Sequence, residues 1–395
     1  MSVFRTAEGR EKVRAMYEGI LSRFPVERQY IDTSQGRTFL LEAGPKDASP
    51  VVLLHGSCGN SAFWLGDILS LASRFRVLSL DIPGEAGMSD ENRFDFESDN
   101  CISWLDGTLR TLGIARAALI GNSFGGWLAL KYAASHPERV AKIAAFVPAG
   151  VVPPSGLFQA ESLATHVEDA GGRSELNDAV TEGAAMPEPV AEFLRLIGES
   201  FLPMTCALPV FSDAALKGIA MPALFAFAER DVTMDARAAA ARVGSLLPQA
   251  EVCLLPNQGH VITNIAEIAL PFLAEPQPLI PARQDGLNAM IIDRWTRVTD
   301  PQQLLDAMAT AGYLGASAMA AYAESLGQAF FDLKTGIAGE MLQKFSNYHM
   351  RLAIIGDFSN VSSRSLRDFI RESNRGNTVR FAQSLESALS AFAAR

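Results

Sequence analysis

The pentapeptide Gly121-Asn122-Ser123-Phe124-Gly125 combines residue types and a spacing that could support nucleophilic chemistry. In the G-x-S-x-G pattern, a serine occupies a sharp turn between a buried strand and a helix. An apolar run over residues 117–120 precedes the turn, and a helix-like stretch over residues 127–134 follows it. The glycines on either side have no Cβ, so the strand and the helix can approach closely. The sequence therefore predicts that Ser123 is a nucleophile whose hydroxyl points into a cleft.

His260 is the expected general base. A serine hydroxyl is a weak nucleophile at its own pKa, so it needs a base that removes its proton and a carboxylate that orients this base. Among the five histidines of the chain, His260 lies in a loop just past the strand-like run Glu251–Leu255, which suits a base. We expect His136, near a helix end, to be a surface or capping residue. His166 falls in the expected cap and should be solvated, with a substrate contact as the alternative.

Asp231 is the expected carboxylate that orients His260. It follows the apolar, strand-like run over residues 222–228, so it also lies just past the end of a strand. Glu229 and Asp235 belong to the same loop and remain alternatives for this role. The predicted catalytic residues are therefore Ser123, Asp231 and His260.

A second turn, His55-Gly56-Ser57, follows the apolar run Val51–Leu54 and is expected to help stabilise the transition state. Acyl transfer develops negative charge on an oxygen atom, and fixed backbone N–H groups stabilise this charge. The expected donors are the backbone N–H groups of Ser57 and of Phe124, the residue after the nucleophile. We expect His55 itself to be a structural turn residue that is bonded to backbone groups.

Together these features resemble the α/β-hydrolase superfamily over about residues 10 to 275. The resemblance is carried by His55-Gly56, the loop Asp81–Ser89, the turn at Ser123, the segment Ala133–Val140 with its His-Pro-Glu-Arg-Val sequence, Asp231 and His260. Three further segments are similar to a bacterial carboxylesterase-like branch: Met16-Tyr17, Phe24–Val26 and Ile31–Thr38. The resemblance implies an α/β fold in which helices flank a mostly parallel sheet below a small helical cap. It also implies a serine hydrolase that cleaves a small-molecule carboxylic ester through an acyl-enzyme on Ser123.

Two departures from the superfamily pattern occur in loops. The usual short P-G-x-G turn is replaced by the longer Pro83–Gly87, and Ala228 replaces a common glycine. Carbon-carbon bond hydrolases of the meta-cleavage type also resemble the chain at its two glycine turns, but they typically have a tryptophan after the catalytic histidine, where this chain has Val261. We therefore expect an esterase, with two alternatives: a carbon-carbon bond hydrolase, or a hydrolase-like binding or receptor module.

The chain is long enough for two domains, since it has 395 residues and 48% of them are hydrophobic. Residues 1–278 are expected to form the hydrolase domain, with a cap over about residues 150–220. The proline-rich stretch Pro271–Pro281 is expected to break the helical pattern and to form a semi-rigid linker. Residues 285–395 are expected to form a second, small α/β domain.

The C-terminal region alternates between strand-like and helix-like runs. Strands are expected at 288–292, 329–333, 352–355 and 379–381, and helices at 301–310, 336–345, 363–372 and 385–393. The segments 330–340, 343–345, 355–358 and 372–376 resemble a bacterial domain family of unknown function, which also occurs alone. Five polar residues could line a site at strand ends, namely Asp332, Glu340, Asp357, Glu372 and Asn374. Capping and turn roles are the alternative for Asp357, Ser359 and Asn374. We expect this domain to be a regulatory or interaction module, and a second catalytic centre is the alternative.

Composition restricts the class of protein further. The net charge of −10 argues against nucleic acid as a partner, because phosphates are bound by clustered Lys and Arg. The sequence has no recognisable signal peptide or membrane-spanning run and no C-x-x-C pairing, so we expect a cytoplasmic protein with no membrane partner. It has no metal-ligand pattern and no phosphate-binding loop, so neither a metal nor a cofactor is expected. The sequence does not indicate an oligomeric state.

Overall fold

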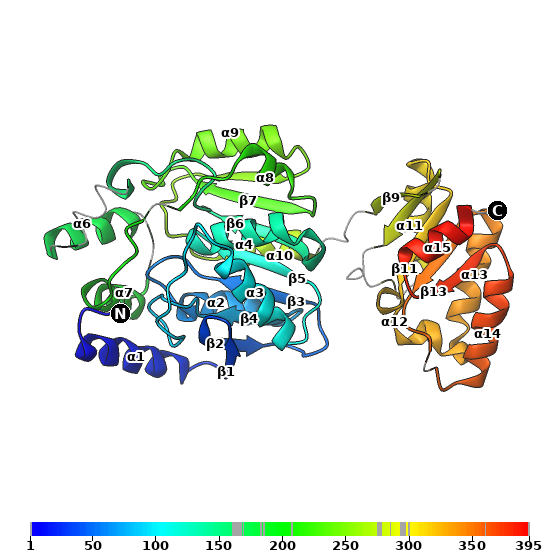
Figure 1. Cartoon of the computed structure of the whole chain (residues 1–395), viewed down its shortest axis with the longest axis horizontal. Helices are drawn as coiled ribbons and strands as arrows, with labels where there is room; N and C mark the ends of the chain where they lie inside the picture. Colours follow the sequence, from blue (N-terminus) through cyan, green and yellow to red (C-terminus); the bar gives the residue numbers. More distant parts are fainter. Residues whose placement is uncertain are drawn as a thin grey trace. The chain divides into compact units, whose positions relative to one another are not determined.

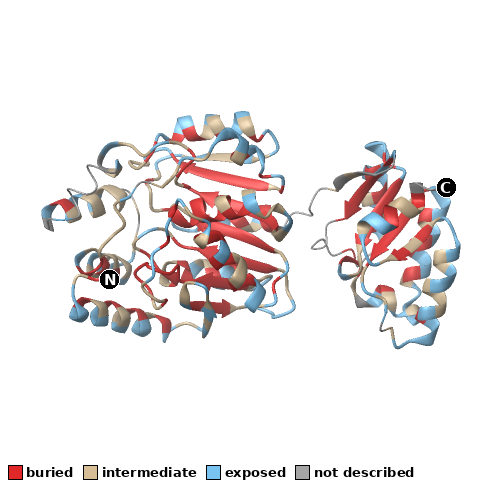
Figure 2. Ribbon diagram, viewed as in Figure 1, coloured by how far each residue is buried: buried red, intermediate tan, exposed pale blue. Residues whose placement is uncertain are grey.

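The computed structural model describes residues 2–159, 168, 170–181, 184, 186–206, 208–274, 279–284, 286–292, 298, 301–359 and 361–393. The chain divides into two compact units, Met1–Ala274 and Glu275–Arg395 (Figure 1). Each unit has a sheet of its own and buries its own hydrophobic residues (Figure 2).

The first unit is built on an eight-stranded sheet with the order β1-β2-β4-β3-β5-β6-β7-β8. Its strands are β1 Glu27–Thr33, β2 Gly36–Ala43, β3 Pro50–Leu54, β4 Arg76–Leu80, β5 Ala117–Asn122, β6 Val140–Phe146, β7 Ala223–Ala228 and β8 Glu251–Leu255. The strands from β4 to β8 along this order pair in parallel, whereas β2 is antiparallel to both of its neighbours. Every residue of β3, β6 and β7 is buried, as expected for strands that helices cover on both faces. The predicted α/β-hydrolase sheet is confirmed.

The first unit also contains helices, several of which flank the sheet (Figure 1). They are α1 Ala7–Leu21, η1 Ser61–Trp64, α2 Leu65–Leu71, α3 Asn100–Thr111, α4 Phe124–Ser135, η2 Pro137–Arg139, η3 Gly156–Phe158, α6 Ala170–Thr181, α7 Glu188–Ser200, α8 Asp213–Lys217, α9 Ala236–Leu246 and α10 Ile265–Ala274. Helices α6 and α7 lie in the insertion between β6 and β7, where the cap is expected. Residues 160–167 of this insertion, which include His166, lie outside the described residues.

The N-terminal segment is bonded to the end of α7. The Leu202 N–H donates to the carbonyl oxygen of Val3, and the Arg5 N–H donates to that of Ser200, both at 2.8 Å. Between these bonds, Phe4 pairs with Phe201 in an antiparallel bridge, and their rings meet edge to face with centroids 5.7 Å apart. Helix α1 then packs along α7. The insertion is thus attached to the start of the chain as well as to the two strands that flank it.

Helix α10 contains Pro271, so the expectation that the helical pattern breaks at this proline was wrong. Proline has no N–H and usually disrupts a helix interior. The next turn forms here because Phe272 and Leu273 are buried in the core, and because the Lys142 ammonium donates to their carbonyl oxygens at 2.6 and 3.4 Å. Carbonyl groups in the last turn of a helix have no intrahelical donor, so this lysine fills that role. Residues 275–278 of the expected linker lie outside the described residues, and Pro281 belongs to a strand.

The second unit has a five-stranded sheet with the order β13-β12-β11-β10-β9. Its strands are β9 Ile280–Gln284, β10 Leu287–Ile292, β11 Ala318–Tyr322, β12 Arg351–Ile355 and β13 Val379–Ala382. Its helices are α11 Pro301–Tyr313, α12 Ala323–Phe331, η4 Leu333–Thr335, α13 Ile337–Asn347, α14 Arg364–Arg375 and α15 Leu385–Ala393. Only β9 is antiparallel among these strands, and core clusters lie on both faces of the sheet. The predicted small α/β architecture is confirmed.

The strand expected at 329–333 is absent, and this prediction was wrong. Residues Ala323–Phe331 form α12, and the strand that pairs with β10 is Ala318–Tyr322. Aromatic residues favour strands, which made the Phe330-Phe331 pair misleading; in the structure Phe330 is a buried residue of α12. The sequence of β11, Ala-Met-Ala-Ala-Tyr, has weak strand propensity, but its short side chains let helices pack on both faces. Packing therefore overrides propensity at this position.

Candidate active site

Ser123 lies between β5 and α4 in a backbone conformation that serine rarely adopts. Its φ of 53° and ψ of −111° form a tight turn, in which its N–H donates to the carbonyl oxygen of Phe146 at 2.9 Å. A Cβ on Gly121 would collide with the backbone of Gly125, and a Cβ on Gly125 would collide with the carbonyl oxygen of Leu54. Strained backbone of this kind occurs often at functional sites. The strand, turn and helix that the G-x-S-x-G pattern predicts are therefore present.

The side chains of Ser123, His260 and Asp231 form a continuous chain of hydrogen bonds. Ser123 Oγ lies 3.0 Å from His260 Nε2, and His260 Nδ1 lies 2.9 Å from Asp231 Oδ2 and 3.1 Å from Asp231 Oδ1. An ionised carboxylate can only accept, so the Nδ1 atom carries the proton and Nε2 is free to accept from the serine hydroxyl. This tautomer is the one that a general base requires.

The Asp231 carboxylate is shielded from solvent. Its side chain is 0% exposed and that of His260 is 14% exposed. Burial opposes ionisation of this carboxyl, but hydrogen bonds from His260 and Thr233 outweigh the burial and hold the pKa of Asp231 below its usual value. An ionised Asp231 can stabilise the imidazolium that forms when His260 accepts a proton.

The two alternative carboxylates make contacts elsewhere. Glu229 Oε1 accepts from the Arg237 guanidinium at 2.7 Å. Asp235 is the N-cap of α9 and accepts from the Ala238 N–H at 2.9 Å. Of the three acidic residues in this loop, the structure brings Asp231 into contact with His260.

Thr233 is a residue of the site that the sequence analysis missed. Its N–H and its hydroxyl donate to Asp231 Oδ1 at 2.8 and 2.7 Å, and its Oγ1 lies 3.2 Å from His260 Nδ1. These bonds occupy Oδ1 and direct Oδ2 toward the histidine. A Thr or Ser two residues after a candidate Asp can form such a turn, and this local pattern was the available signal.

We expect Thr233→Val to lower kcat about tenfold and to leave KM within about twofold, because the acceptor geometry of Asp231 is loosened while the substrate site is unchanged. Steady-state kinetics on an activated ester measure this effect. Thr233→Ser keeps the hydroxyl and should stay within about twofold of the wild-type kcat. A valine variant as active as the serine variant would exclude this role for the hydroxyl.

Of the two expected oxyanion donors, Phe124 directly follows the nucleophile, and Ser57 belongs to a turn whose Gly56 lies close to it. Phe124 begins α4, where backbone N–H groups have no intrahelical acceptor. The backbone of the second turn is also close, since a Cβ on Gly56 would lie 3.4 Å from the Ser123 Cβ. Within the described residues, neither the Ser57 N–H nor the Phe124 N–H has an acceptor. Both groups are therefore free to bind a substrate oxygen.

Residues 55–61 (the His55 loop) are fastened to residues 81–88 (the Glu85 loop). The bonds run from the Ile82 N–H to His55 Nε2 at 2.9 Å, from the Cys58 N–H to Glu85 Oε2 at 2.7 Å, from Asn60 Nδ2 to the Ala86 carbonyl oxygen at 2.8 Å, and from the Ser61 N–H to Asp81 Oδ1 at 2.8 Å. The other ring nitrogen of His55 bonds to the Gly56 carbonyl oxygen at 2.8 Å, so the structural role expected for this histidine is confirmed. The lengthened Pro83–Gly87 turn thus holds the His55 loop through Glu85 and Ala86, a contact that the sequence alone did not predict.

The remaining functional signals are sparse. His136 caps the C-terminus of α4 and stacks on Tyr132 with ring centroids 5.0 Å apart, which confirms its capping role.

Across the described residues, no group of three or more His, Cys, Asp or Glu side chains could hold a metal ion. In the same part of the chain, no helix combines the length and the apolar character needed to cross a membrane.

The candidate polar residues of the second unit have local structural roles. Asp332 and Asp357 accept from the backbone N–H groups of Lys334 and Ser359, at 3.2 and 2.9 Å. Asn374 bonds to both backbone groups of Phe381 on the edge strand β13, at 2.7 and 3.1 Å, and so substitutes for a neighbouring strand. Glu372 pairs with Arg375 on α14, and Glu340 is exposed on α13. The turn role expected for Asp357 is confirmed, whereas the expectation of a capping or turn role for Asn374 was wrong, because its side chain bonds to β13.

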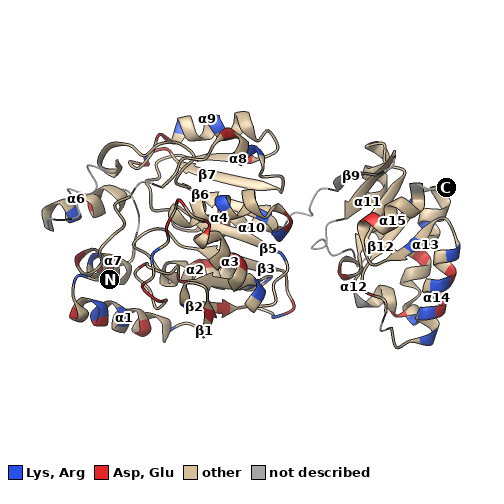
Figure 3. Ribbon diagram, in the orientation of Figure 1, with Lys and Arg blue, Asp and Glu red and all other residues tan. Residues whose placement is uncertain are grey.

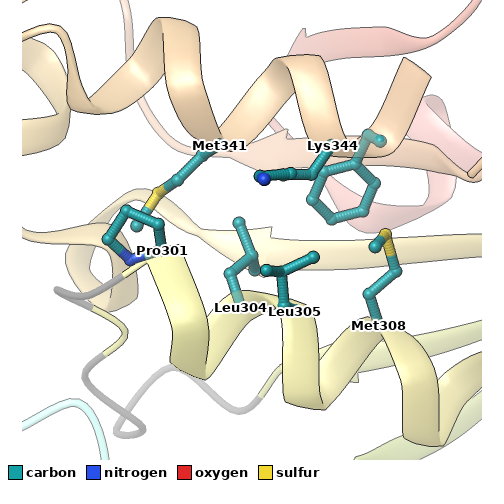
Figure 4. Close-up of a pocket in the computed structure, with 7 residues that line it drawn as sticks. Pro301, Leu304, Leu305, Met308, Met341 and Lys344 are labelled. Atoms are coloured by element: carbon teal, nitrogen blue, oxygen red, sulfur yellow. The ribbon is translucent and has the colours of Figure 1, made fainter. Parts of the chain in front are cut away.

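Two surface features of this unit are also explained by structure. Helix α14 carries charged residues along one side, as Figure 3 shows. Arg364 and Arg371 pair with Asp368, and Arg375 pairs with Glu372, whereas Arg367 donates to backbone carbonyl oxygens. A hollow between α11 and α13 is lined by Pro301, Leu304, Leu305, Met308, Met341, Lys344 and Phe345 (Figure 4). Lys344 supplies its one charged group, so the hollow is mainly an opening into the apolar core between the two helices.

Family models match both units. Residues 49–166 match the α/β hydrolase fold, and residues 285–392 match a domain of unknown function, DUF4180. The first match contains the His55 loop and Ser123. The second covers the C-terminal sheet and its helices.

Relatives with known names resemble the first unit. Carboxylesterase YbfK of Bacillus subtilis is 28% identical over 280 residues, which is 66% of this chain and 91% of that protein. The crystal structure of YbfK superimposes on this chain with a TM-score of 0.63 and 25% identity. This match covers 68% of this chain and 99% of the YbfK chain. The naproxen esterase of Bacillus subtilis has a TM-score of 0.61 at 26% identity, over 68% of this chain and 99% of that one. A 2-hydroxy-6-oxononadienedioate/2-hydroxy-6-oxononatrienedioate hydrolase of Paraburkholderia phymatum is 37% identical over 119 residues, which is 29% of this chain and 37% of that protein. With the parallel sheet and the turn at Ser123, these matches identify the chain as a carboxylesterase-like α/β hydrolase fused to a DUF4180 domain.

Proposed function

We propose that the protein hydrolyses a small-molecule carboxylic ester through an acyl-enzyme on Ser123. The observation that carries this proposal is the chain of hydrogen bonds from Ser123 Oγ through the His260 imidazole to Asp231. Two relatives that match most of the first unit are named as esterases, which supports an ester as the substrate.

The reaction follows from the geometry of these groups. His260 Nε2 takes the hydroxyl proton as Ser123 Oγ attacks the ester carbonyl carbon, and the Ser57 and Phe124 N–H groups stabilise the negative oxygen. The imidazolium then gives its proton to the departing alcohol, which leaves an acyl group on Ser123. In the second half, His260 takes a proton from water, the resulting nucleophile attacks the acyl carbon, and the proton returns to Ser123 as the acid leaves.

A panel of p-nitrophenyl esters with increasing acyl length tests this proposal. We expect steady release of p-nitrophenol, and a burst close to one equivalent per chain wherever deacylation is slower than acylation. The chain length with the highest kcat/KM would then define the acyl preference. Purified protein that neither turns over nor becomes acylated by any ester would refute esterase activity and leave the binding or receptor alternative.

Carbon-carbon bond hydrolysis is the second candidate. It is favoured by the 37% identity to a dienedioate hydrolase, although that match covers only 29% of this chain. Val261 replaces the tryptophan typical of that class after the histidine, which favours the esterase. Turnover of a vinylogous 6-oxo dienoate faster than any p-nitrophenyl ester would reverse this ranking.

We also propose that residues 1–278 form an independent catalytic domain. The core cluster of the first unit lies entirely within residues 3–273, and the two clusters of the second unit lie within residues 287–392. A protein truncated after residue 278 should therefore fold and retain a kcat within about twofold of the full chain. Circular dichroism and ester kinetics measure the two properties. A folded but inactive truncation would instead assign the DUF4180 domain a part in the reaction.

A further inference from the structure

Glu85 is a buried carboxyl beside the proposed oxyanion site. It is 3% exposed, and its Oε2 atom accepts the Cys58 N–H at 2.7 Å. Cys58 has a φ of 57° and directly follows Ser57, whose N–H is a proposed oxyanion donor. The hydrogen bond that Glu85 accepts therefore holds the Ser57–Cys58 peptide unit, which directly follows the proposed oxyanion donor.

The Glu85 loop leaves its carboxyl little freedom. Gly84 has a φ of 79°, and a Cβ there would lie 2.8 Å from the Arg93 backbone. A Cβ on Gly87 would collide with the Asp81 carboxylate, which itself accepts the Ser61 N–H. Close contacts at Gly84 and Gly87 thus restrict the backbone on both sides of Glu85.

We propose that Glu85 is a positioning residue for the reaction. Its carboxyl accepts the Cys58 N–H and thereby orients the neighbouring Ser57 N–H toward the substrate oxygen. This arrangement supports catalysis while the carboxyl is neutral. The inference rests on the proposed ester hydrolysis. It explains why an acidic residue occupies the centre of the lengthened Pro83–Gly87 turn.

The charge of Glu85 changes within a measurable pH range. Burial raises the pKa of Glu85 to about 8, and the hydrogen bond from Cys58 and the positive charge of Arg93 offset part of this increase. Arg93 and the Cys58 thiol are the titratable groups that face it among the described residues. Below this pH the carboxyl is mainly protonated. Above it, a carboxylate lies next to the site where the transition state places a second negative charge, and the two charges repel.

The pH dependence of kcat in the full-length protein tests this proposal. For wild type we expect kcat to fall about tenfold between about pH 7 and pH 9.5. Glu85→Gln keeps an acceptor for the Cys58 N–H and cannot ionise, so its kcat should match wild type at pH 7 and remain level across this range. Glu85→Ala should lower kcat about 10- to 100-fold at every pH, with KM within about twofold, because the oxyanion donor is displaced.

Glu97→Gln is the matched control, since Glu97 is exposed and its substitution should leave the wild-type pH profile unchanged. Hydrogen exchange of the His55 loop provides a measurement that does not depend on ester turnover. Faster exchange of this loop in Glu85→Ala than in Glu85→Gln or wild type would support the positioning role even if the esterase proposal failed. Equal exchange in all variants, or an alkaline decrease in kcat that persists in Glu85→Gln, would overturn the inference.

Discussion

Replacing Ser123 with alanine is expected to abolish ester hydrolysis and to leave the fold intact. The hydroxyl is the proposed nucleophile, and its closest catalytic contact is His260 Nε2 at 3.0 Å. The members of such a relay act as a unit, so kcat should fall on the order of 10⁴-fold or more. Alanine fits the turn, because it removes only the Oγ atom from a position whose φ of 53° the neighbouring glycines already support.

Steady-state kinetics and a thermal unfolding curve of the Ser123→Ala protein measure these two properties. Ser135→Ala, at the exposed end of the same helix, is the matched control and should retain wild-type activity; its hydroxyl contacts only the Lys131 carbonyl oxygen within the described residues. A folded Ser123→Ala protein that keeps more than about a tenth of wild-type kcat would refute the nucleophile assignment.

Asp231→Asn is expected to lower kcat on the order of 10³- to 10⁴-fold. An amide can donate to His260 Nδ1 through its nitrogen, which stabilises the wrong tautomer and leaves the proton on Nε2, where it blocks acceptance from Ser123. KM should change little, since Asp231 is buried behind the histidine and does not face the substrate.

Two carboxylates of the same loop provide controls for this prediction. Glu229→Gln disturbs only the pair with Arg237, and Asp235→Asn keeps an N-cap for α9, so both variants should stay within about threefold of wild-type kcat. The assignment of the orienting carboxylate would move to Glu229 if Glu229→Gln proved more damaging than Asp231→Asn.

The parts of the site that the sequence predicted are those with a local signature. The serine turn requires glycines at fixed spacing, and His260 and Asp231 each follow a strand-like run, so short stretches contain the signal. The sequence favoured Asp231 but left Glu229 and Asp235 as alternatives, because the side chain that reaches His260 depends on how β7 and β8 lie side by side. The structure selects the contact with Asp231, although the roles of all three residues remain predictions.

Contacts between distant loops escaped the sequence analysis. Glu85 contacts Cys58 across 27 residues of chain, and no local pattern encodes such a partner. Dependence on distant neighbours also explains the error at β11. Its alanines have weak strand propensity, but their small side chains allow helices to pack on both faces of the sheet. Propensity and periodicity describe neighbours along the chain, whereas these features depend on neighbours in space.

The bridge between Phe4 and Phe201 cannot form during synthesis until residue 201 has been added to the chain. These residues are separated by about 200 positions, so at roughly 5 to 20 residues per second the ribosome produces the partner on the order of 10 to 40 seconds after the N-terminal segment. Throughout that interval Val3 and Phe4, which are buried in the finished protein, lack their contacts with Phe201 and Leu202. The first strands can pair while the segment waits, but α1 cannot close on α7 until the insertion has left the ribosome. The contact between residues 3–5 and the insertion can therefore form only after strands β1 to β6 have been synthesised.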